Sequence, residues 1–426
     1  MLRFSPSPTK DLTVSDLRVA LFNYLVSKQL EEDLVIRIDD TNKKEVIEGK
    51  DKEIIEIINL FSIDYKGVLH QSDSLKYHQK IAMQLMGKKN AFSCFCGDEK
   101  LEELKQKAIK AGSTPVYDGF CETLSDETVL NTNAPFTVRI KKPQDNISFE
   151  DGLFSKQDFT CDEVDYFHIL DHDKMPTYNY ACSVDDMIMN ISTIIRGEEN
   201  LLNTARQIYI RKLLGYDKEI NYTHIPNIEN NKNEEITVKS LIDDGFLPSA
   251  IANYLVSIGN ETPTEIFTLE DAIKWFDIKN TSKDELVFDM EKLKELNKKH
   301  LETIDDMRLS KILGFADADL GKLGKLYLQN CSTINELKEN ISLIFKEKEV
   351  SKELEENFIS IKNALTKAPY IESFNELEEF ILDKTKLNKN EISLALRVLL
   401  TNKQDGPKLD EIYPLIKNYL GEILKW

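Results

Sequence analysis

Residues 2–38 read LRFSPSPTKDLTVSDLRVALFNYLVSKQLEEDLVIRI, and this stretch predicts a strand, a loop, a helix and a second strand. The loop at 6–11 contains two prolines, which fix φ and remove hydrogen-bond donors, so it cannot lie inside a helix. Apolar residues recur at helical spacing over Leu17–Leu25 and predict a helix there, with Ser15 or Asp16 as its N-cap.

The second strand is followed by further alternation of strands and helices. The run at 34–38 is apolar and β-branched around one Arg, which predicts a buried strand, and a helix is expected around 51–60. This order favours a parallel α/β sheet, which binds ligands at the C-terminal ends of its strands. Short strand candidates between about 90 and 175 predict an insertion, after which the α/β pattern resumes near Tyr178. Helical periodicity dominates from about 246 onward.

Length and composition limit the protein classes. The chain has 426 residues, enough for two to four domains, and its 41% apolar content excludes a disordered or fibrous chain. No run approaches about eighteen apolar residues and no apolar signal core stands at the start, so we expect neither a spanning helix nor secretion. Six cysteines are too few for a disulfide scaffold and indicate a reducing cytoplasm. The net charge of −19 argues against broad attraction to phosphate backbones but is compatible with a local basic face.

Several short motifs follow one another along the chain. They are RFSPSPT (3–9), ALFN (20–23), RIDDT (37–41), PTYNYA (176–181), VDD (184–186), IRGEE (195–199), DGFLP (244–248), TPTE (262–265), LR (396–397) and GP (406–407). In this order and spacing the chain resembles bacterial glutamyl-tRNA synthetase, a class I aminoacyl-tRNA synthetase, over nearly its whole length. The family activates glutamate with ATP and Mg²⁺ and then transfers it to the 3′ end of tRNA.

The resemblance implies an α/β fold followed by an all-α region. A Rossmann-type catalytic domain is split by an α+β acceptor-stem insertion, and a helical anticodon-binding region follows. The expected boundaries are 1–90 for the first catalytic half, 91–177 for the insertion, 178–245 for the second half, 246–310 for a stem-contact region and 311–426 for the anticodon-binding domain.

Two ATP-binding signature motifs of this family are degenerate here. In the HIGH-type motif, Thr13 stands where the family has a phosphate-binding His, and Ser15 replaces a Gly that lies against adenine. Asp16 adds a negative charge, a repulsion of roughly 4 kcal/mol at about 4 Å and an effective dielectric of ~20. In place of the lysine-rich KMSKS-type loop, residues 227–235 read NIENNKNEE, where only Lys232 could clamp phosphates. We therefore expect ATP-dependent activation to be weak or absent.

The resemblance also implies a glutamate pocket. Its walls are formed by Arg3, Ser5 and Ser7 on one side and by Tyr178, Cys182 and Arg196 on the other. A guanidinium suits a substrate carboxylate through bidentate pairing, although Arg196 alone would also suit a structural ion pair. Asp39 stands where the family has a Glu that holds the amino group. The charge is kept but the reach is one methylene shorter, so we expect weaker glutamate binding.

A group of cysteines lies within the predicted insertion. Cys94, Cys96 and Cys121 could hold Zn²⁺ in tetrahedral geometry, with Tyr117 or water as the fourth ligand. By resemblance, some family members carry a structural zinc in such a Cys-x-Cys…Tyr-x-x-x-Cys pattern. The other family pattern has a His two residues after the third Cys, where this chain has Thr123. Buried free thiols are the alternative interpretation.

Three hypotheses on function stay open. The first is a catalytically impaired homologue that still binds glutamate-type tRNA, glutamate or both. The second is a working glutamate–tRNA ligase with atypical signature motifs, and the third is a scaffold that binds a protein partner. We expect a cytoplasmic monomer without membrane association. ATP–pyrophosphate exchange, with and without tRNA, would separate the second hypothesis from the others.

Overall fold

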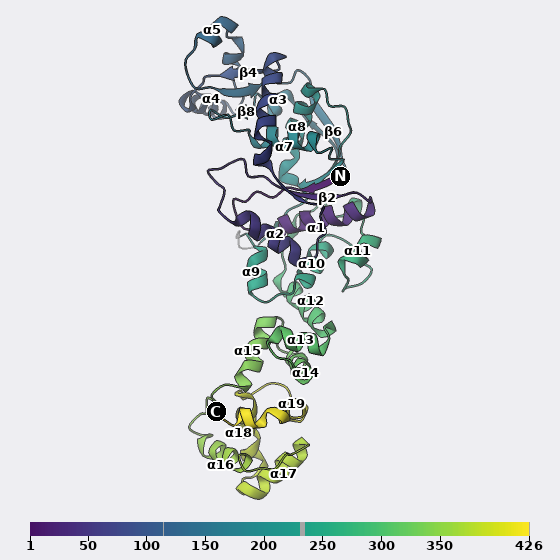
Figure 1. The fold of residues 1–426 in the computed structure, drawn as a ribbon, viewed down its shortest axis with the longest axis vertical. Coiled ribbons are helices and arrows are strands. Elements are labelled where there is room, and N and C mark those ends of the chain that lie inside the picture. The colour runs from purple at the N-terminus through teal and green to yellow at the C-terminus, as the bar shows by residue number, and fades with distance from the viewer. Residues whose placement is uncertain (114, 231–234, 426) are drawn as a thin grey trace. The chain divides into compact units, whose positions relative to one another are not determined.

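A computed structural model describes the chain except for a few residues, and it divides into two compact units (Figure 1). The described residues are 1–113, 115–230 and 235–425. Unit 1 comprises Met1–Lys239 and Leu255–Phe288, and unit 2 comprises Ser240–Tyr254 and Asp289–Trp426. Within the described ranges, no helix is both long and apolar enough to cross a membrane.

Unit 1 is built around a seven-stranded sheet with the order β3-β2-β1-β9-β10-β6-β7. Its strands are β1 (Leu2–Phe4), β2 (Leu34–Ile38), β3 (Val68–His70), β6 (Ile147–Asp151), β7 (Ser155–Phe159), β9 (Thr193–Gly197) and β10 (Asn221–Ile225). All neighbouring pairs are parallel except β6 and β7, which are antiparallel. The C-terminal ends of β1, β2, β9 and β10 therefore meet at one edge, and the predicted parallel α/β sheet is confirmed.

Helices cover both faces of this sheet (Figure 1). One face carries α1 (Val14–Gln29) and α2 (Lys50–Leu60), and the other carries α3 (Leu75–Gly87), α7 (Tyr178–Ile188) and α8 (Leu201–Leu214). Helix α1 packs on β1, β2 and β9, and all of its residues from Ala20 to Ser27 are buried.

The start of α1 differs from the prediction. Its N-cap is Thr13, not Ser15 or Asp16, and Thr13 has the extended backbone that an N-cap requires. The Thr13 hydroxyl accepts a hydrogen bond from the Asp16 backbone N–H at 3.2 Å, and the Asp16 carboxylate accepts one from the Thr13 N–H at 3.0 Å. This reciprocal capping box begins the helix at Val14, three residues before Leu17, where the predicted apolar periodicity starts.

The segment at 91–177 contributes to two sheets. A small antiparallel sheet has the order β4-β5-β8 and consists of β4 (Ala91–Cys94), β5 (Thr137–Ile140) and β8 (His168–Leu170). The other two strands of the segment, β6 and β7, extend the main sheet beyond β10. The helices here are short or exposed: α4 (Asp98–Lys110), α5 (Asp126–Asn131) and α6 (Cys161–Val164).

Unit 1 ends with a short parallel pair and a helix. The pair is β11 (Ile228–Glu229) with β12 (Leu286–Val287), and the helix is α11 (Leu269–Trp275). Two helices contain residues of both units, α9 (Val238–Asp243) and α10 (Pro248–Ser257).

The described part of unit 2 beyond Asp289 is helical, as the periodicity predicts. Its helices are α12 (Met290–Thr303), α13 (Asp306–Leu313), α14 (Ala318–Tyr327), α15 (Ile334–Ile344), α16 (Glu355–Leu365), α17 (Phe374–Thr385), α18 (Lys389–Thr401), α19 (Leu409–Ile416) and α20 (Leu420–Ile423). One continuous aliphatic core joins them, with Leu309, Leu323, Leu337, Ile361, Leu396 and Ile412 fully buried. The predicted α/β-then-α architecture is therefore confirmed.

Candidate active site

A cavity of about 180 Å³ lies at the C-terminal edge of the parallel sheet in unit 1. Its lining includes six residues of the predicted glutamate pocket: Arg3, Ser5, Ser7, Asp39, Tyr178 and Arg196. They come from β1, the opening loop, the end of β2, the start of α7 and the end of β9. The seventh, Cys182, lies behind the wall and donates a hydrogen bond to Asp39 Oδ2 at 3.3 Å. Segments far apart in the sequence thus converge on one cavity because their strands are neighbours.

A buried network of alternating charges forms the floor of this cavity. The Asp186 carboxylate on α7 accepts hydrogen bonds from Arg3 Nε at 3.2 Å and from Arg37 Nη1 at 2.6 Å. Arg37 also donates its Nε to Asp39 Oδ1 at 2.7 Å. Burial alone would raise the pKa of the Asp186 carboxyl, but Arg3 and Arg37 hold it well below its usual value. Each buried charge is therefore paired, as charges of low solvent access must be.

Arg196 at the end of β9 differs from Arg3 and Arg37, because none of its hydrogen bonds among the described residues goes to a carboxylate. Its Nη2 donates to Thr204 Oγ1 and its Nε to His224 Nε2 at 3.3 Å. Its Nη1 is buried without a hydrogen-bond partner among the described residues, and the hydroxyl of Ser5 is in the same state. One nitrogen each of Arg18, Arg139 and Arg211 is also buried without a partner there, but these three arginines are not among the residues that line the cavity. Arg196 lines the cavity and is only 6% exposed. An unpaired buried guanidinium nitrogen is costly, so a ligand oxygen would complete this site.

The opening of α1, where the sequence predicts a phosphate-binding loop, is occupied by the chain itself. The Thr13 N–H bonds to Asp16 Oδ2, the Val14 N–H to the Ile236 carbonyl, and the Asp16 N–H to Thr13 Oγ1. Ser15 Oγ accepts a hydrogen bond from the Ile228 N–H at 2.9 Å. These bonds tie the two predicted signature segments together and use several of the amide donors that a phosphate would otherwise find there.

A second cavity of about 480 Å³ lies beside this helix start. Among the described residues, its lining contains four carboxylates and a single lysine: Asp16, Glu199, Glu229, Glu235 and Lys10. Lys10 Nζ forms an ion pair with Glu235 Oε1 at 2.6 Å, and both side chains are more than half exposed. Thr13 and Ser15 also line this cavity, whereas Lys232 lies outside the described residues. This outer region is acidic, as the sequence predicts.

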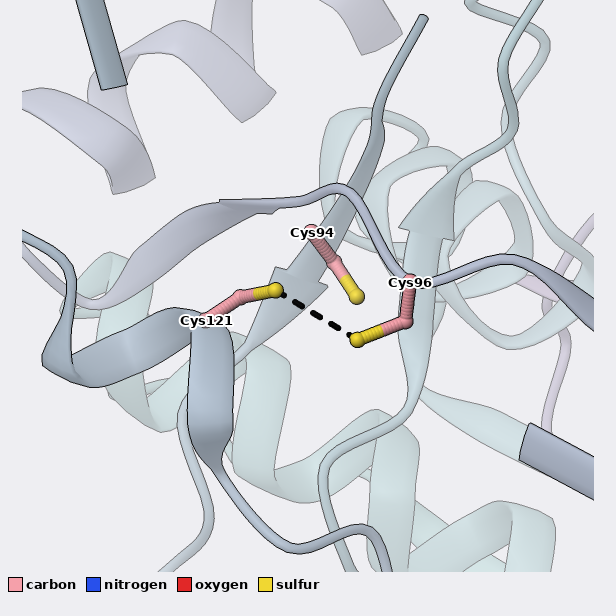
Figure 2. Close-up of side chains that lie close together, drawn as sticks. All are labelled: Cys94, Cys96 and Cys121. Carbon is pink, nitrogen blue, oxygen red and sulfur yellow. Dashed lines mark hydrogen bonds between the residues drawn. The ribbon is translucent and has the colours of Figure 1, made fainter. Parts of the chain in front are cut away.

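The predicted cysteine cluster assembles beside the small sheet (Figure 2). The sulfurs of Cys94, Cys96 and Cys121 point toward one another and all lie within 4.8 Å of each other. The Tyr117 hydroxyl lies 3.3 Å from Cys96 Sγ and 3.7 Å from Cys94 Sγ. Zn–S bonds of about 2.3 Å place tetrahedral sulfurs ~3.8 Å apart, so this donor set fits zinc. Thr123 does not compete, since its hydroxyl donates to the Phe120 carbonyl.

The thiols of this cluster have different proton affinities. Burial alone would raise the pKa of Cys94, but hydrogen bonds from His168, from the Cys96 backbone and from Arg139 lower it to about 5. Burial and the charge on Cys94 raise the pKa of Cys96 to about 11. A divalent cation would remove that repulsion and favour all three thiolates.

Several residues of the site carry no role in the sequence analysis. They are Arg37, Asp151, Asp186, Thr204 and His224. For Arg37 the sequence does contain a usable indication, because a charged residue within the buried run 34–38 needs a buried partner. The others could not be paired from local pattern, since their contacts connect different strands and helices.

Three comparisons with known proteins agree with this architecture. The family "tRNA synthetases class I (E and Q), catalytic domain" matches residues 1–295. The chain is 46% identical to glutamate–tRNA ligase 2 of Sulfurimonas denitrificans and 43% identical to glutamate–tRNA ligase 1 of Campylobacter jejuni, with all of each chain covered. Its fold matches the crystal structure of a glutamate tRNA ligase from Elizabethkingia meningosepticum in complex with its amino acid, at a TM-score of 0.82 and 20% identity, covering 100% of this chain and 98% of that one. The chain therefore belongs to the class I tRNA synthetases for glutamate and glutamine.

Proposed function

We propose that this chain is a glutamate–tRNA ligase that activates glutamate with ATP and transfers it to tRNA. The observation that carries the proposal is the unpaired, buried Nη1 of Arg196, a residue that lines a cavity at the C-terminal edge of the parallel sheet. Relatives with 43–46% identity over their full length are glutamate–tRNA ligases, which supports the same conclusion.

The inner cavity would bind glutamate through a few side chains. Arg196 Nη1 and the Ser5 hydroxyl, both unpaired among the described residues, would bind a carboxylate of the substrate. Asp39 would face the ammonium group, but its oxygens are already engaged by Arg37 and Cys182. We therefore expect selectivity for the acid to depend mainly on Arg196, with weaker help from Asp39.

The outer cavity would hold the nucleotide. ATP with Mg²⁺ supplies the activating phosphoryl chemistry in this family, and the cation neutralises phosphate charge. In this chain Lys10 is the single lysine among the described residues that line the second cavity, and Glu199 and Glu229 there would suit a cation rather than a phosphate. The ATP half of the reaction therefore depends on fewer protein cations than the signature motifs would provide.

A second candidate function is a homologue impaired in activation that still binds glutamate or tRNA. The observation in its favour is the start of α1, where Asp16 and Thr13 occupy amide donors, and where the described lining has four carboxylates and one lysine. The full-length relatives support the functional ligase more strongly than this alternative.

Pyrophosphate exchange tests the proposal directly. Protein purified away from any host synthetase should catalyse glutamate-dependent ATP–pyrophosphate exchange, measured with and without glutamate-type tRNA. Glutamate binding without exchange in either condition would favour the impaired homologue. Neither exchange nor binding of glutamate or tRNA would leave only the scaffold hypothesis.

We further infer that tRNA binds along the predicted domains. The insertion at 91–177 would contact the acceptor stem, the region at 246–310 the stem, and residues 311–426 the anticodon. With a net charge of −19, binding would rest on local contacts of matched shape and fall as salt rises. A titration of glutamate-type tRNA against an unrelated tRNA at two salt concentrations tests this, and equal negligible binding of both would exclude it.

We also propose that Cys94, Cys96, Cys121 and Tyr117 hold one structural zinc. Their convergence within bonding geometry supports this, as does the small hydrophobic cluster around them. Elemental analysis of chelator-free protein should give about one zinc per chain. A Cys96→Ser variant should lose it together with thermal stability, whereas Cys161→Ser, at an isolated cysteine, should keep it.

A further inference from the structure

Arg196 is held from behind by a chain of fully buried polar groups. Asp151 at the end of β6, His224 on β10 and Thr204 on α8 are each at most 5% exposed. They connect in sequence: Asp151 to His224, His224 to Thr204, and both His224 and Thr204 to Arg196. The two nitrogens of Arg196 that meet this chain are Nε and Nη2, and Nη1 is left without a partner among the described residues.

The tautomer of His224 follows from its partners. Asp151 Oδ2 lies 2.6 Å from His224 Nδ1 and also accepts the His224 backbone N–H at 3.0 Å. A carboxylate accepts hydrogen bonds, so Nδ1 carries the proton and Nε2 is the acceptor. Nε2 then faces the Thr204 hydroxyl at 2.7 Å and Arg196 Nε at 3.3 Å.

We propose that His224, oriented by Asp151, is a positioning residue that sets the plane of the Arg196 guanidinium for a substrate carboxylate. This inference rests on the proposed function, in which Arg196 binds glutamate. A planar guanidinium pairs well with a carboxylate only in one orientation, so fixing Nε and Nη2 fixes where Nη1 points. The acceptor at Nε2 is the atom on which this depends.

Substituting His224 by Gln or by Asn tests its acceptor nitrogen, Nε2, and its donor nitrogen, Nδ1, separately. His224→Gln places an amide oxygen near the position of Nε2 and can still accept from Arg196. His224→Asn places its amide near Nδ1 and can still donate to Asp151, but its side chain no longer reaches Arg196 Nε, and Arg196 keeps only its bond to Thr204. Asp151 tolerates the first change because the backbone N–H groups of Leu153 and Phe154 also bind it at 3.0 and 2.9 Å.

The measurement is glutamate affinity by calorimetry, together with KM for glutamate and for ATP in pyrophosphate exchange. We expect His224→Asn to weaken glutamate binding about tenfold, the typical effect of losing a hydrogen bond to a charged group. His224→Gln should stay within about threefold of wild type, and KM for ATP should change in neither variant. A purely structural role would move both KM values or only the melting temperature.

A matched control is available in the same unit. His78 is equally buried and pairs with Asp185 at 2.7 Å, but it does not line the cavity. His78→Gln should lower stability without a selective change in glutamate affinity. If the His224 variants do not fold, Thr204→Val against Thr204→Ser tests the same chain, with the loss expected only in Val.

The outcomes distinguish this inference from the proposed function. Glutamate binding by wild type with equal affinity in His224→Asn and His224→Gln, or in the two Thr204 variants, would overturn the inference alone. A wild-type chain that binds no glutamate would overturn the proposed role of Arg196, and this inference with it. Selective loss in His224→Asn, or in Thr204→Val, supports the positioning role.

Discussion

The charged side chains of the inner half of the pocket are buried and paired with one another, whereas those of the outer half are mostly exposed and acidic. In the inner half, Arg3, Arg37, Asp39 and Asp186 are at most 7% exposed, and each has a partner of opposite charge within 3.2 Å. Among the described residues of the outer half, four carboxylates stand against one lysine, and most of these side chains are exposed. These four buried charges compensate one another, whereas Arg196 in the same half has no carboxylate partner among the described residues and the charges of the outer half are largely exposed to solvent.

This difference shows where such a site can change. Removing one member of a buried pair leaves an uncompensated charge in a medium of low dielectric, so the inner residues depend on one another. Exposed charges are screened by water and ions and can change singly at little cost to folding. At the start of α1, Lys10 is exposed and Ser15 and Asp16 are half-buried, whereas Thr13 is buried.

The largest effect should come from breaking the inner half. Asp186→Asn would leave Arg3 and Arg37 without a common counter-charge, and we expect it to cost about 3–5 kcal/mol of stability in urea unfolding. Because the native pKa of Asp186 lies below its unfolded value, its contribution is present above about pH 4 and lost as the pH falls through the native pKa.

The Asp186 prediction has a built-in control. Asp33→Asn removes a carboxylate that pairs with Lys66 at 2.6 Å while half exposed, and should cost under about 1 kcal/mol. Equal unfolding midpoints for the two variants would contradict the contrast between the halves. The Asp186 variant should also lack part of the acid sensitivity of wild type.

The second-largest effect should be on the affinity for glutamate rather than on the stability of the fold. Arg196→Leu should weaken glutamate binding about a hundredfold, because the carboxylate would lose its charged partner in a desolvated site. Arg196→Lys should recover only part of this, since an ammonium cannot reproduce the planar fork. Calorimetry with glutamate is the measurement, and unchanged affinity in the Leu variant would show that the carboxylate lies elsewhere.

Much of the fold could be predicted, because local patterns determine local structure. The helix after the proline loop and the strand at 34–38 follow from apolar spacing, and both are present. The N-cap of α1 was misplaced because a capping box depends on side chains, Thr13 and Asp16, that have no hydrophobic signal. The membership of β6 and β7 in the main sheet was not predicted either, since strand order is a long-range property.

The sequence could identify residues that line the site, but not the hydrogen bonds that connect them to the residues behind. The motifs identified Arg3, Ser5 and Arg196, and the structure brings them to one cavity. The contact of Arg196 with His224 joins neighbouring parallel strands, and that of His224 with Asp151 crosses from β10 to β6. Neither pairing has a local pattern, so the sequence alone could not show what holds Arg196 in place.

A moderate effect is expected from relieving the acidity of the outer half. Asp16→Asn keeps an oxygen that can accept the bonds from Thr13, so α1 should remain capped. Removing one negative charge a few ångströms from the phosphates should lower KM for ATP roughly fivefold, since such a charge is worth about 1 kcal/mol in water. Pyrophosphate exchange measures this, and a rise in KM would mean that Asp16 serves a cation.

The smallest effect should come from the exposed ion pair between Lys10 and Glu235. Glu235→Gln frees Lys10 for phosphate and should lower KM for ATP by about twofold to threefold. Lys10→Ala should raise it by a similar factor. Both effects should shrink in high salt, because exposed charges are screened over roughly 10 Å at 0.1 M. Lys66→Ala, at a pair of similar length and exposure on the same unit, should change neither KM nor its salt dependence. Effects of the same sign in the Lys10 and Glu235 variants would show that the pair acts as a structural tie across the two loops and not as a competitor for phosphate.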